Sequence, residues 1–307
     1  MRLVGFADPD DGQTLGEVVG ERLIPLPAGR LDTILLEEGG LGLLRRKAAE
    51  LAGASGLVRG SVRLLAPLDP GKIVCVGLNY RDHVAEGAAR ETPAWPLLFA
   101  KFANAVIADG EAIVRPEGTH ALDLEVELGV VIGRRARRVA VEAAMDHVAG
   151  YVVVNDVSAR DWQGNTAALA EGQKGDGQWL RAKGSDTFLP MGPVFVTADE
   201  LDPAAGLRLR SWRIPGPGRP GAGEPQLMQD GSTSDLIFGV AELVSFISRH
   251  ITLEPGDVIA TGTPAGVGVF RDPPVFLEPG DRVRCEIEGI GSVENPIVDW
   301  TEDPRPT

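Results

Sequence analysis

Three acidic residues alternate with apolar ones in the stretch HALDLEVELGVVIG, residues 120–133. Alternation of this kind is typical of a strand with one buried face. Glu125 and Glu127 would then point to the same side of the strand, with their side-chain bases roughly 7 Å apart. Like charges at that spacing repel unless a cation lies between them, so the pattern of Asp123, Glu125 and Glu127 raises the question of a metal site.

A second apolar run, GYVVVND, ends at Asp156, and the segment between the two runs is long enough to bring the chain back along a neighbouring strand. Three carboxylates from adjacent strands would offer hard oxygen ligands, which suit Mg²⁺, Mn²⁺ or Ca²⁺ better than Zn²⁺. The alternative is a solvated strand face, because charged residues usually face water. Strands disfavour Asp and Glu, however, and the apolar continuation favours the metal site.

His83 and Glu86 lie three residues apart in VCVGLNYRDHVAEG, where a predicted strand runs into a polar turn and the start of a helix. This spacing places both side chains on one helical face. A carboxylate beside a histidine can set its tautomer and pKa, as in a general base. The alternative is a surface pair without a role.

Three further segments carry polar residues that follow predicted strands or turns. Arg160 and Gln163 come directly after the strand that ends at Asp156, and Lys183 lies in WLRAKGSDTF. The Gly-rich turn ATGTPAGVG, residues 260–268, presents backbone N–H groups and Thr263, as anion-binding loops do. A Gly-rich turn can also be only a turn.

Composition limits the classes of partner. The chain has 307 residues, 43% hydrophobic and 24% charged, which is ordinary for a globular protein. A formal net charge of -14 argues against a general affinity for nucleic acid or anionic membranes. We read Cys75 and Cys285 as small buried hydrophobes. The first residues, MRLVGFADPDDGQ, do not resemble a signal peptide, and no apolar run reaches the length of a membrane span, so we expect a cytoplasmic protein.

The elements that must position these residues are mostly strands. Residues 1–65 predict a small α+β unit, with a helix over 41–52, and the Pro- and Gly-containing segment 64–72 separates it from a larger unit, 70–302. The larger unit contains many predicted strands and two predicted helices, so the fold class is α+β, mainly β. Its predicted strands are 72–78, 97–102, 123–133, 150–156, 192–196, 256–262 and 281–289, and its predicted helices are 141–148 and 240–251. The low-complexity insert 213–225 predicts a mobile hairpin tip.

Six ordered segments of the chain resemble the fumarylacetoacetate hydrolase family. They are KIVCVGLNYRDHVAEG, DLEVELGVVIGRRARRV, GYVVVNDVSARDWQ, QWLRAKGSDTFLPMGP, QDGSTSDLIF and LEPGDVIATGTPAGVG. The resemblance runs from about residue 72 to 298, and residues 1–65 resemble the cap domain of some members. It implies a mixed β-sheet roll or barrel, usually a homodimer.

The same resemblance implies roles for the polar residues. A divalent metal, with Mg²⁺ as the first choice, would bind Glu125, Glu127 and Asp156. His83 and Glu86 would form the base, Lys183 would be both catalytic and substrate-binding, and Gln163 and Thr263 would contact the substrate. Arg160 would lie near the metal and the substrate, supporting Asp156 or the base.

Two departures from the family pattern bear on the substrate. Members that hydrolyse fumarylacetoacetate carry an additional Asp ligand after the strand end, where this chain has Leu78 and Asn79. That substrate is therefore disfavoured. Many relatives also have Gly-Lys-Ser where this chain has Ala182–Lys183–Gly184.

The family chemistry acts on 2-oxo acids through an enolate. Our first prediction is a metal-dependent hydrolase that cleaves a C–C bond of a 2,4-dioxo acid of the acylpyruvate or fumarylpyruvate type. The alternatives are a decarboxylase or isomerase of a 2-oxo diacid such as oxaloacetate, and a catalytically silent binding relative, which the presence of both His83 and Glu86 disfavours. Because a base must be near the substrate while the site opens to load it, residues 80–95 are predicted to form a mobile lid.

Overall fold

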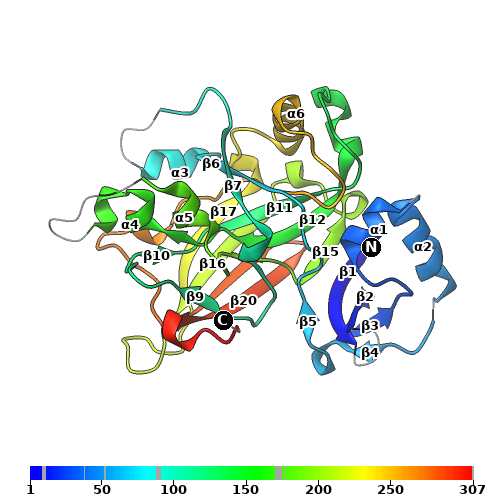
Figure 1. The fold of residues 1–307 in the computed structure, drawn as a ribbon, viewed down its shortest axis with the longest axis horizontal. Coiled ribbons are helices and arrows are strands. Elements are labelled where there is room, and N and C mark those ends of the chain that lie inside the picture. Colours follow the sequence, from blue (N-terminus) through cyan, green and yellow to red (C-terminus); the bar gives the residue numbers. More distant parts are fainter. Residues whose placement is uncertain are drawn as a thin grey trace.

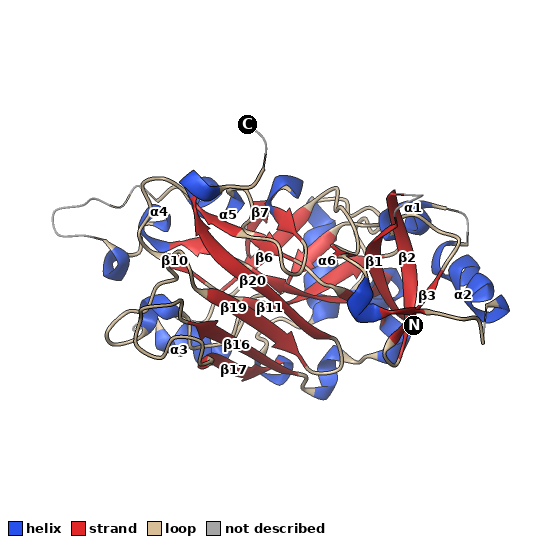
Figure 2. Ribbon diagram, turned by 90° about the horizontal axis from the view of Figure 1, so that it is seen from below, coloured by secondary structure: helices blue, strands red, loops and turns tan. Residues whose placement is uncertain are grey.

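Two large β-sheets lie face to face and carry the core of the protein (Figure 1, Figure 2). The computed structural model describes residues 1–8, 12–37, 39–51, 53–87, 91–169, 175 and 177–305. Strands dominate and the sheets mix parallel with antiparallel pairs, so the predicted class, α+β and mainly β with a mixed sheet roll, is confirmed. In the described part of the chain neither sheet closes into a barrel.

The larger sheet joins strands from both ends of the sequence. Its neighbours are antiparallel except for the parallel pair β18 and β6. In spatial order its strands are β4 (Leu57–Val58), β3 (Arg22–Pro25), β2 (Gly12–Val19), β1 (Arg2–Asp8), β15 (Val194–Thr197), β12 (Val148–Asn155), β11 (Val126–Ile132), β18 (Val258–Ala260), β6 (Ile73–Gly77) and β7 (Leu97–Lys101), with β5 (Leu64–Leu65) paired to β1.

The second sheet covers β11 and β12 with its inner face. Its spatial order is β17 (Gln226–Ser232), β16 (Arg208–Ile214), β19 (Arg282–Ile287), β20 (Gly291–Asp299) and β9 (Ile113–Arg115), and only β20 and β9 run parallel. Two short pairs flank the sheets, β10 (Leu122–Asp123) with β13 (Ser158–Ala159), and β8 (Val106–Ile107) with β14 (Leu189–Pro190).

Helices are few and short beside the strands (Figure 2). The α-helices are α1 (Leu31–Leu36), α2 (Gly40–Glu50), α3 (Arg81–Glu86), α4 (Arg160–Gln163), α5 (Trp179–Gly184) and α6 (Val240–His250). The 3₁₀ helices are η1 (Arg59–Ser61), η2 (Ala103–Ala105), η3 (Val141–His147), η4 (Thr166–Ala168), η5 (Ala198–Glu200), η6 (Pro203–Ala205), η7 (Thr233–Asp235), η8 (Gly268–Phe270) and η9 (Trp300–Glu302). The helix predicted over 240–251 is thus confirmed as α6, whereas the one predicted over 141–148 is 3₁₀.

One prediction about the acidic strand is wrong in detail. The stretch from Leu122 to Ile132 is not one strand with a single buried face, because it breaks at Leu124 and Glu125 and every residue in it is buried. One side packs in the core, and the other side faces the buried polar cluster described below rather than water. The acids therefore occupy an interior position.

The segment 213–225 holds the last two residues of β16 and the connection to β17, so it is the tip of a hairpin as predicted, while its mobility stays a prediction. The N-terminal residues predicted as a small unit contain β1–β5, α1, α2 and η1. This unit is not separated from the rest by sheet pairing, because β1 pairs with β15 through Leu3 and Phe195. Both Cys75 and Cys285 are buried and free.

Candidate metal centre and active site

Glu125, Glu127 and Asp156 converge at one point of the structure. One carboxylate oxygen from each lies within 4.8 Å of the others. The antiparallel pairing of β11 with β12 produces this, since Val126 lies opposite Asn155 and the two acidic strand ends meet. The backbone N–H of Asp156 donates to the Glu125 carbonyl at 2.9 Å, which fixes the two ends together.

Three buried cations surround this triad. Lys183 Nζ contacts Glu125 Oε2 at 2.8 Å and Asp156 Oδ2 at 2.9 Å. Lys101 Nζ lies 2.7 Å from Asp156 Oδ1, and an Arg160 nitrogen lies 2.6 Å from Glu125 Oε1. All three cationic side chains are at most 5% exposed, so water screens these contacts little.

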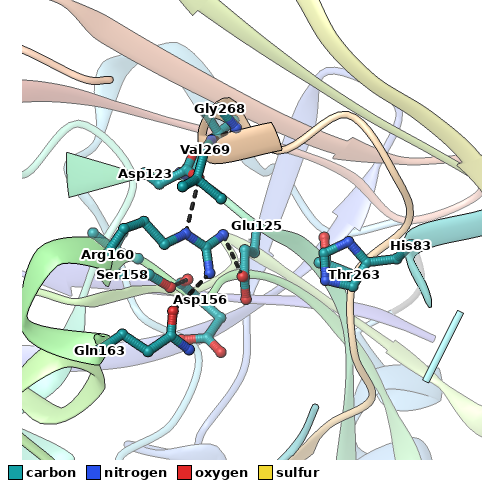
Figure 3. A network of polar contacts seen from close by, with 12 residues as sticks. His83, Asp123, Glu125, Asp156, Ser158, Arg160, Gln163, Thr263, Gly268 and Val269 are labelled. Carbon is teal, nitrogen blue, oxygen red and sulfur yellow. Dashed lines mark hydrogen bonds and ion pairs between the residues drawn. The ribbon is translucent and has the colours of Figure 1, made fainter. Parts of the chain in front are cut away.

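Asp123, the first acid of the alternating stretch, does not join the triad. Its carboxylate accepts from Arg160 Nε at 2.9 Å and from the backbone N–H groups of Gly268 and Val269 at 2.8 and 3.0 Å (Figure 3). Arg160 thus bridges Asp123 and Glu125, and it also donates to Gln163 Oε1 at 3.1 Å. The family resemblance predicts that Arg160 supports Asp156 or the base, whereas the structure places it against Asp123 and Glu125.

The charges within the cluster are unevenly balanced. Burial alone would raise the pKa of Glu125, but Lys183 and Arg160 lower that pKa well below its usual range. Burial, followed by the charges of Asp156 and Glu125, raises the pKa of Glu127 well above its usual value. Among the described residues, no basic side chain lies within ion-pair distance of Glu127, whose one hydrogen bond donor is the Gly262 N–H at 2.8 Å.

These residues fit a divalent metal ion. Among the described residues, four buried carboxylates, Asp123 included, face three buried cations, so full ionisation would leave the cluster with an excess of negative charge. A charge taken out of water is stable only when paired, and no cation in the described part of the chain lies within ion-pair distance of Glu127. Three converging carboxylates are also the hard oxygen donors that Mg²⁺ and Mn²⁺ prefer.

His83 is held in one orientation beside the triad. Its Nδ1 lies 3.2 Å from Glu86 Oε2, while Glu86 Oε1 accepts the Gly266 N–H at 2.8 Å. A carboxylate only accepts hydrogen bonds, so Nδ1 carries the proton and Nε2 is left as the basic nitrogen. The Phe270 ring packs against the imidazole, with ring centroids 5.8 Å apart and tilted by 52°.

The predicted site residues share one cavity of about 280 Å³. Seven of the nine line it directly, whereas Glu86 and Asp156 act from behind, through His83 and through the triad. The lining residues are Val76, Gly77, Leu78, His83, Phe99, Glu125, Glu127, Arg160, Gln163, Gly164, Asn165, Trp179, Lys183, Thr263 and Phe270. The lid predicted over 80–95 stays a prediction, because 81–86 form α3 and 88–90 lie outside the described residues.

The Gly-rich turn binds anions, but those anions belong to the protein. Gly262 N–H holds Glu127, Gly266 N–H holds Glu86, and Gly268 N–H holds Asp123. The Thr263 hydroxyl is also engaged, because it donates to the Val126 carbonyl at 2.9 Å and accepts from Gln229 at 2.6 Å. The turn therefore orients three carboxylates of the site.

Leu78 and Asn79 replace the additional acid of some family members, and neither serves as a ligand here. Asn79 is fully buried and its amide bonds the carbonyls of Thr261 and Phe238 and the N–H of Phe238. Leu78 has φ +56°, which is uncommon for a residue with a side chain, and it lines the cavity.

Sequence reasoning missed Lys101, the pairing of Asp123 and the buried amide of Gln229. Lys101 ends the apolar run LLFAK and is 1% exposed. Burial lowers its pKa, although Asp156 opposes this. A lysine inside an apolar strand was a visible signal, because lysine is rarely buried without a partner. Its partner, however, lies 55 residues away along the chain.

Comparison with known proteins identifies the family to which the chain belongs. The sequence model described as fumarylacetoacetate (FAA) hydrolase C-terminal matches residues 72–298. The chain therefore belongs to the fumarylacetoacetate hydrolase family, as the sequence segments predicted. Its relatives in that family are enzymes.

Individual relatives cover nearly the whole chain. The chain is 42% identical to the oxaloacetate tautomerase FAHD2B, mitochondrial, of Bos taurus, over 97% of this chain and 92% of that protein. It is 41% identical to the human oxaloacetate tautomerase FAHD2A, with the same coverage. The crystal structure of 2-hydroxyhepta-2,4-diene-1,7-dioate isomerase from Mycobacterium marinum matches with a TM-score of 0.75, 36% identity and coverage of 98% and 100%. No helix in the described residues is both long and apolar enough to cross a lipid bilayer.

Proposed function

We propose that this protein is a metal-dependent tautomerase of a small 2-oxo acid, with oxaloacetate as the first candidate. The observation that carries the proposal is the oriented imidazole of His83 across one cavity from the acidic triad and Lys183. A 2-oxo diacid is chosen over other 2-oxo acids because relatives that align over nearly the whole chain are named oxaloacetate tautomerases. The isomerase neighbour acts by its name on a related dienoic diacid.

Glu125, Glu127 and Asp156 would hold the metal, and Mg²⁺ is the first candidate. When bound, such an ion supplies Lewis acidity toward the oxygen atoms of a 2-oxo acid. The protein contributes the fixed geometry of the ligands. Lys183 and Arg160 hold Glu125, Lys101 and Lys183 hold Asp156, and Gly262 holds Glu127.

The protein side of the reaction is a proton transfer. His83 Nε2 takes a proton from C3 of the keto acid, the C–H electron pair forms the C2=C3 double bond, and the C2 oxygen becomes negatively charged. The ammonium of Lys183 stabilises this charge in a site where little water screens it. The enol forms when the oxygen takes a proton from water, and His83 returns its own proton to solvent. Glu86 stabilises the imidazolium in between.

Gln163 can orient the substrate in this scheme. Its amide oxygen is engaged by Arg160 at 3.1 Å, so its NH₂ group is the part available to a ligand in the cavity (Figure 3). Phe99, Trp179 and Phe270 form apolar parts of the wall. These walls limit water in the site, which suits a reaction whose charge develops on the substrate.

Hydrolysis of a C–C bond in a 2,4-dioxo acid is the second candidate. It is favoured by the structural match to maleylpyruvate hydrolase from Sphingobium sp. SYK-6, with a TM-score of 0.75 and 29% identity. In that case His83 would take its proton from water rather than from the substrate. Decarboxylation of a 2-oxo diacid would use the same enolate, without water.

A substrate panel separates these reactions. Purified protein with Mg²⁺ is given enol-oxaloacetate, keto-oxaloacetate and acetylpyruvate, and the enol absorbance, pyruvate and acetate are followed. The proposal expects rapid enol–keto interconversion, with little pyruvate or acetate. Acetate release from acetylpyruvate at a higher kcat/KM would instead establish the hydrolase, and pyruvate from oxaloacetate the decarboxylase.

A further inference from the structure

Gln229 is a fully buried amide between the two sheets. We propose that it is a positioning residue, which fixes β11, the strand that carries Glu127, against the Gly-rich turn. It lies in β17 with 0% exposure and does not line the cavity. The inference rests on the proposed metal site and extends it to a residue that cannot touch either metal or substrate.

All four hydrogen-bonding positions of the Gln229 amide are used. Its Oε1 accepts from the Val126 N–H at 3.0 Å and from the Ser211 hydroxyl at 2.8 Å. Its Nε2 donates to Thr263 Oγ1 at 2.6 Å and to the Pro264 carbonyl at 2.8 Å. A primary amide has two donors and two strong acceptor sites, so this environment defines which end is oxygen and which is nitrogen.

These contacts connect three elements that must stay in register. Val126 is the residue between Glu125 and Glu127, and its carbonyl in turn accepts the Thr263 hydroxyl at 2.9 Å. Thr263 follows Gly262, whose N–H holds Glu127. Gln229 thus links the backbone of β11 to the Gly-rich turn that orients Glu127. β16 and β17 hold Ser211 and Gln229 in place.

Glu at this position would keep only half of these contacts. In Gln229→Glu, one carboxyl oxygen still accepts from Val126 and Ser211, but the other faces the Pro264 carbonyl, which cannot donate. Loss of a buried partner leaves polar atoms unsatisfied. We expect the turn to shift away from β17, and the Gly262 and Gly266 N–H groups to shift with it.

The test measures metal binding rather than turnover. Mn²⁺ affinity of wild-type and Gln229→Glu proteins is measured by titration calorimetry, together with hydrogen exchange of residues 262–269 in the metal-free proteins. The matched control is Asn295→Asp. Asn295 is 1% exposed in β20 and donates to the Ala108 and Glu111 carbonyls, each at 2.8 Å, away from the cavity.

Both variants should lose thermal stability, because each loses buried hydrogen bonds. Only Gln229→Glu should weaken Mn²⁺ binding, by about tenfold or more, as residues behind metal ligands do, and only this variant should show faster exchange at 262–269. If Gln229→Glu does not fold, Ser211→Ala decides. The Ser211 hydroxyl orients the Gln229 amide, so its removal should weaken Mn²⁺ binding by about two- to threefold.

The outcomes distinguish the inference from the function on which it rests. Gln229 would be only a packing residue if the soluble Gln229 or Ser211 variant bound Mn²⁺ as tightly as the wild-type protein does. The same would follow if Asn295→Asp lost as much Mn²⁺ affinity. Wild-type protein without Mn²⁺ binding would overturn the proposed metal site, and this inference with it.

Discussion

At the scale of single residues, Glu127 is the acid of the triad whose negative charge the described residues compensate least. Burial, Asp156 and Glu125 raise its pKa well above 4.5. A raised pKa means that this group favours folding below its unfolded pKa and that the contribution is lost as pH rises through the folded value. The contribution of Glu127 to the stability of the metal-free protein should therefore fall as pH rises above about 4.5, the ordinary pKa of a glutamate, and a bound metal should restore it.

Glu127→Gln should make the metal-free protein more stable and remove its stabilisation by metal. Removing the poorly paired charge should raise the metal-free Tm at pH 7 by about 2 °C or more, while Mg²⁺ or Mn²⁺ should no longer raise the Tm. Thermal melts with and without metal measure both effects. Glu242→Gln is the control, because Glu242 also accepts a backbone N–H but lies on α6. A metal-dependent Tm retained in Glu127→Gln would contradict the ligand role.

His83→Ala should separate chemistry from binding. Loss of a general base typically lowers kcat by 10²–10⁴-fold. Mn²⁺ affinity should stay within about twofold, because His83 contacts Glu86 and Phe270 rather than a triad carboxylate. Steady-state kinetics and calorimetry on the same preparation check this. Turnover within a few-fold of wild-type would make His83 a packing residue.

At the scale of elements, the Gly-rich turn has backbone angles that only glycine adopts readily, and it orients two carboxylates with different proposed roles. Gly262 and Gly266 have φ +98° and +106°, and a Cβ on Gly266 would lie 2.2 Å from the Met228 carbonyl. Such positions require glycine. Gly262 orients a proposed metal ligand, whereas Gly266 orients the partner of the base.

The two alanine variants should therefore differ in what they lose. Gly262→Ala should weaken Mn²⁺ binding by about tenfold, and Gly266→Ala should lower kcat more than it lowers Mn²⁺ affinity. The control is Gly280→Ala, which has φ +92° but no atom within 4 Å of the added Cβ. Calorimetry and kinetics on the folded fraction test this. The same loss pattern in both turn variants would contradict the division of tasks.

The strands with a clear apolar pattern were predictable, and those with mixed faces were not. β6, β11, β12 and β18 are nearly continuous apolar runs, as interior strands should be. β16 escaped prediction because its outward face carries Arg208 and Arg210, which pair with Asp230 and Glu286 on neighbouring strands. Such cross-strand partners become visible only when the register is known.

At the scale of the whole molecule, strands from residues 1–65 and from residues 70–302 share one sheet. β1 pairs with β15, and Leu3, Val4 and Phe6 are at most 1% exposed. We propose that residues 1–65 and 70–302 unfold together. Calorimetry should show one transition with equal calorimetric and van't Hoff enthalpies. Two resolved transitions would show that the units fold independently.

The site was predictable where each residue marks the end of an element, and unpredictable where distant segments meet. Glu125, Glu127 and Asp156 stand at strand ends, and His83 and Glu86 share one helix. Local pattern therefore suggested each of these two groups, and the resemblance to the fumarylacetoacetate hydrolase family joined them in one site. The pairing of Asp123 with Arg160, of Lys101 with Asp156, and the four contacts of Gln229 depend on sheet packing, which no local window encodes. The homodimer implied by the family resemblance stays a prediction.

In the proposed tautomerase, His83 transfers a proton at C3 of a 2-oxo acid bound at the acidic triad. Enol-oxaloacetate is converted in D₂O with Mg²⁺, and the keto product is trapped at once as malate by excess NADH and malate dehydrogenase. The deuterium at C3 is then located by NMR. We predict deuterium on one face of C3 with wild-type protein, and loss of both the rate and the facial preference with His83→Ala. Deuterium spread equally over both faces at the uncatalysed rate with wild-type protein, or an unchanged facial preference in His83→Ala, would contradict the account.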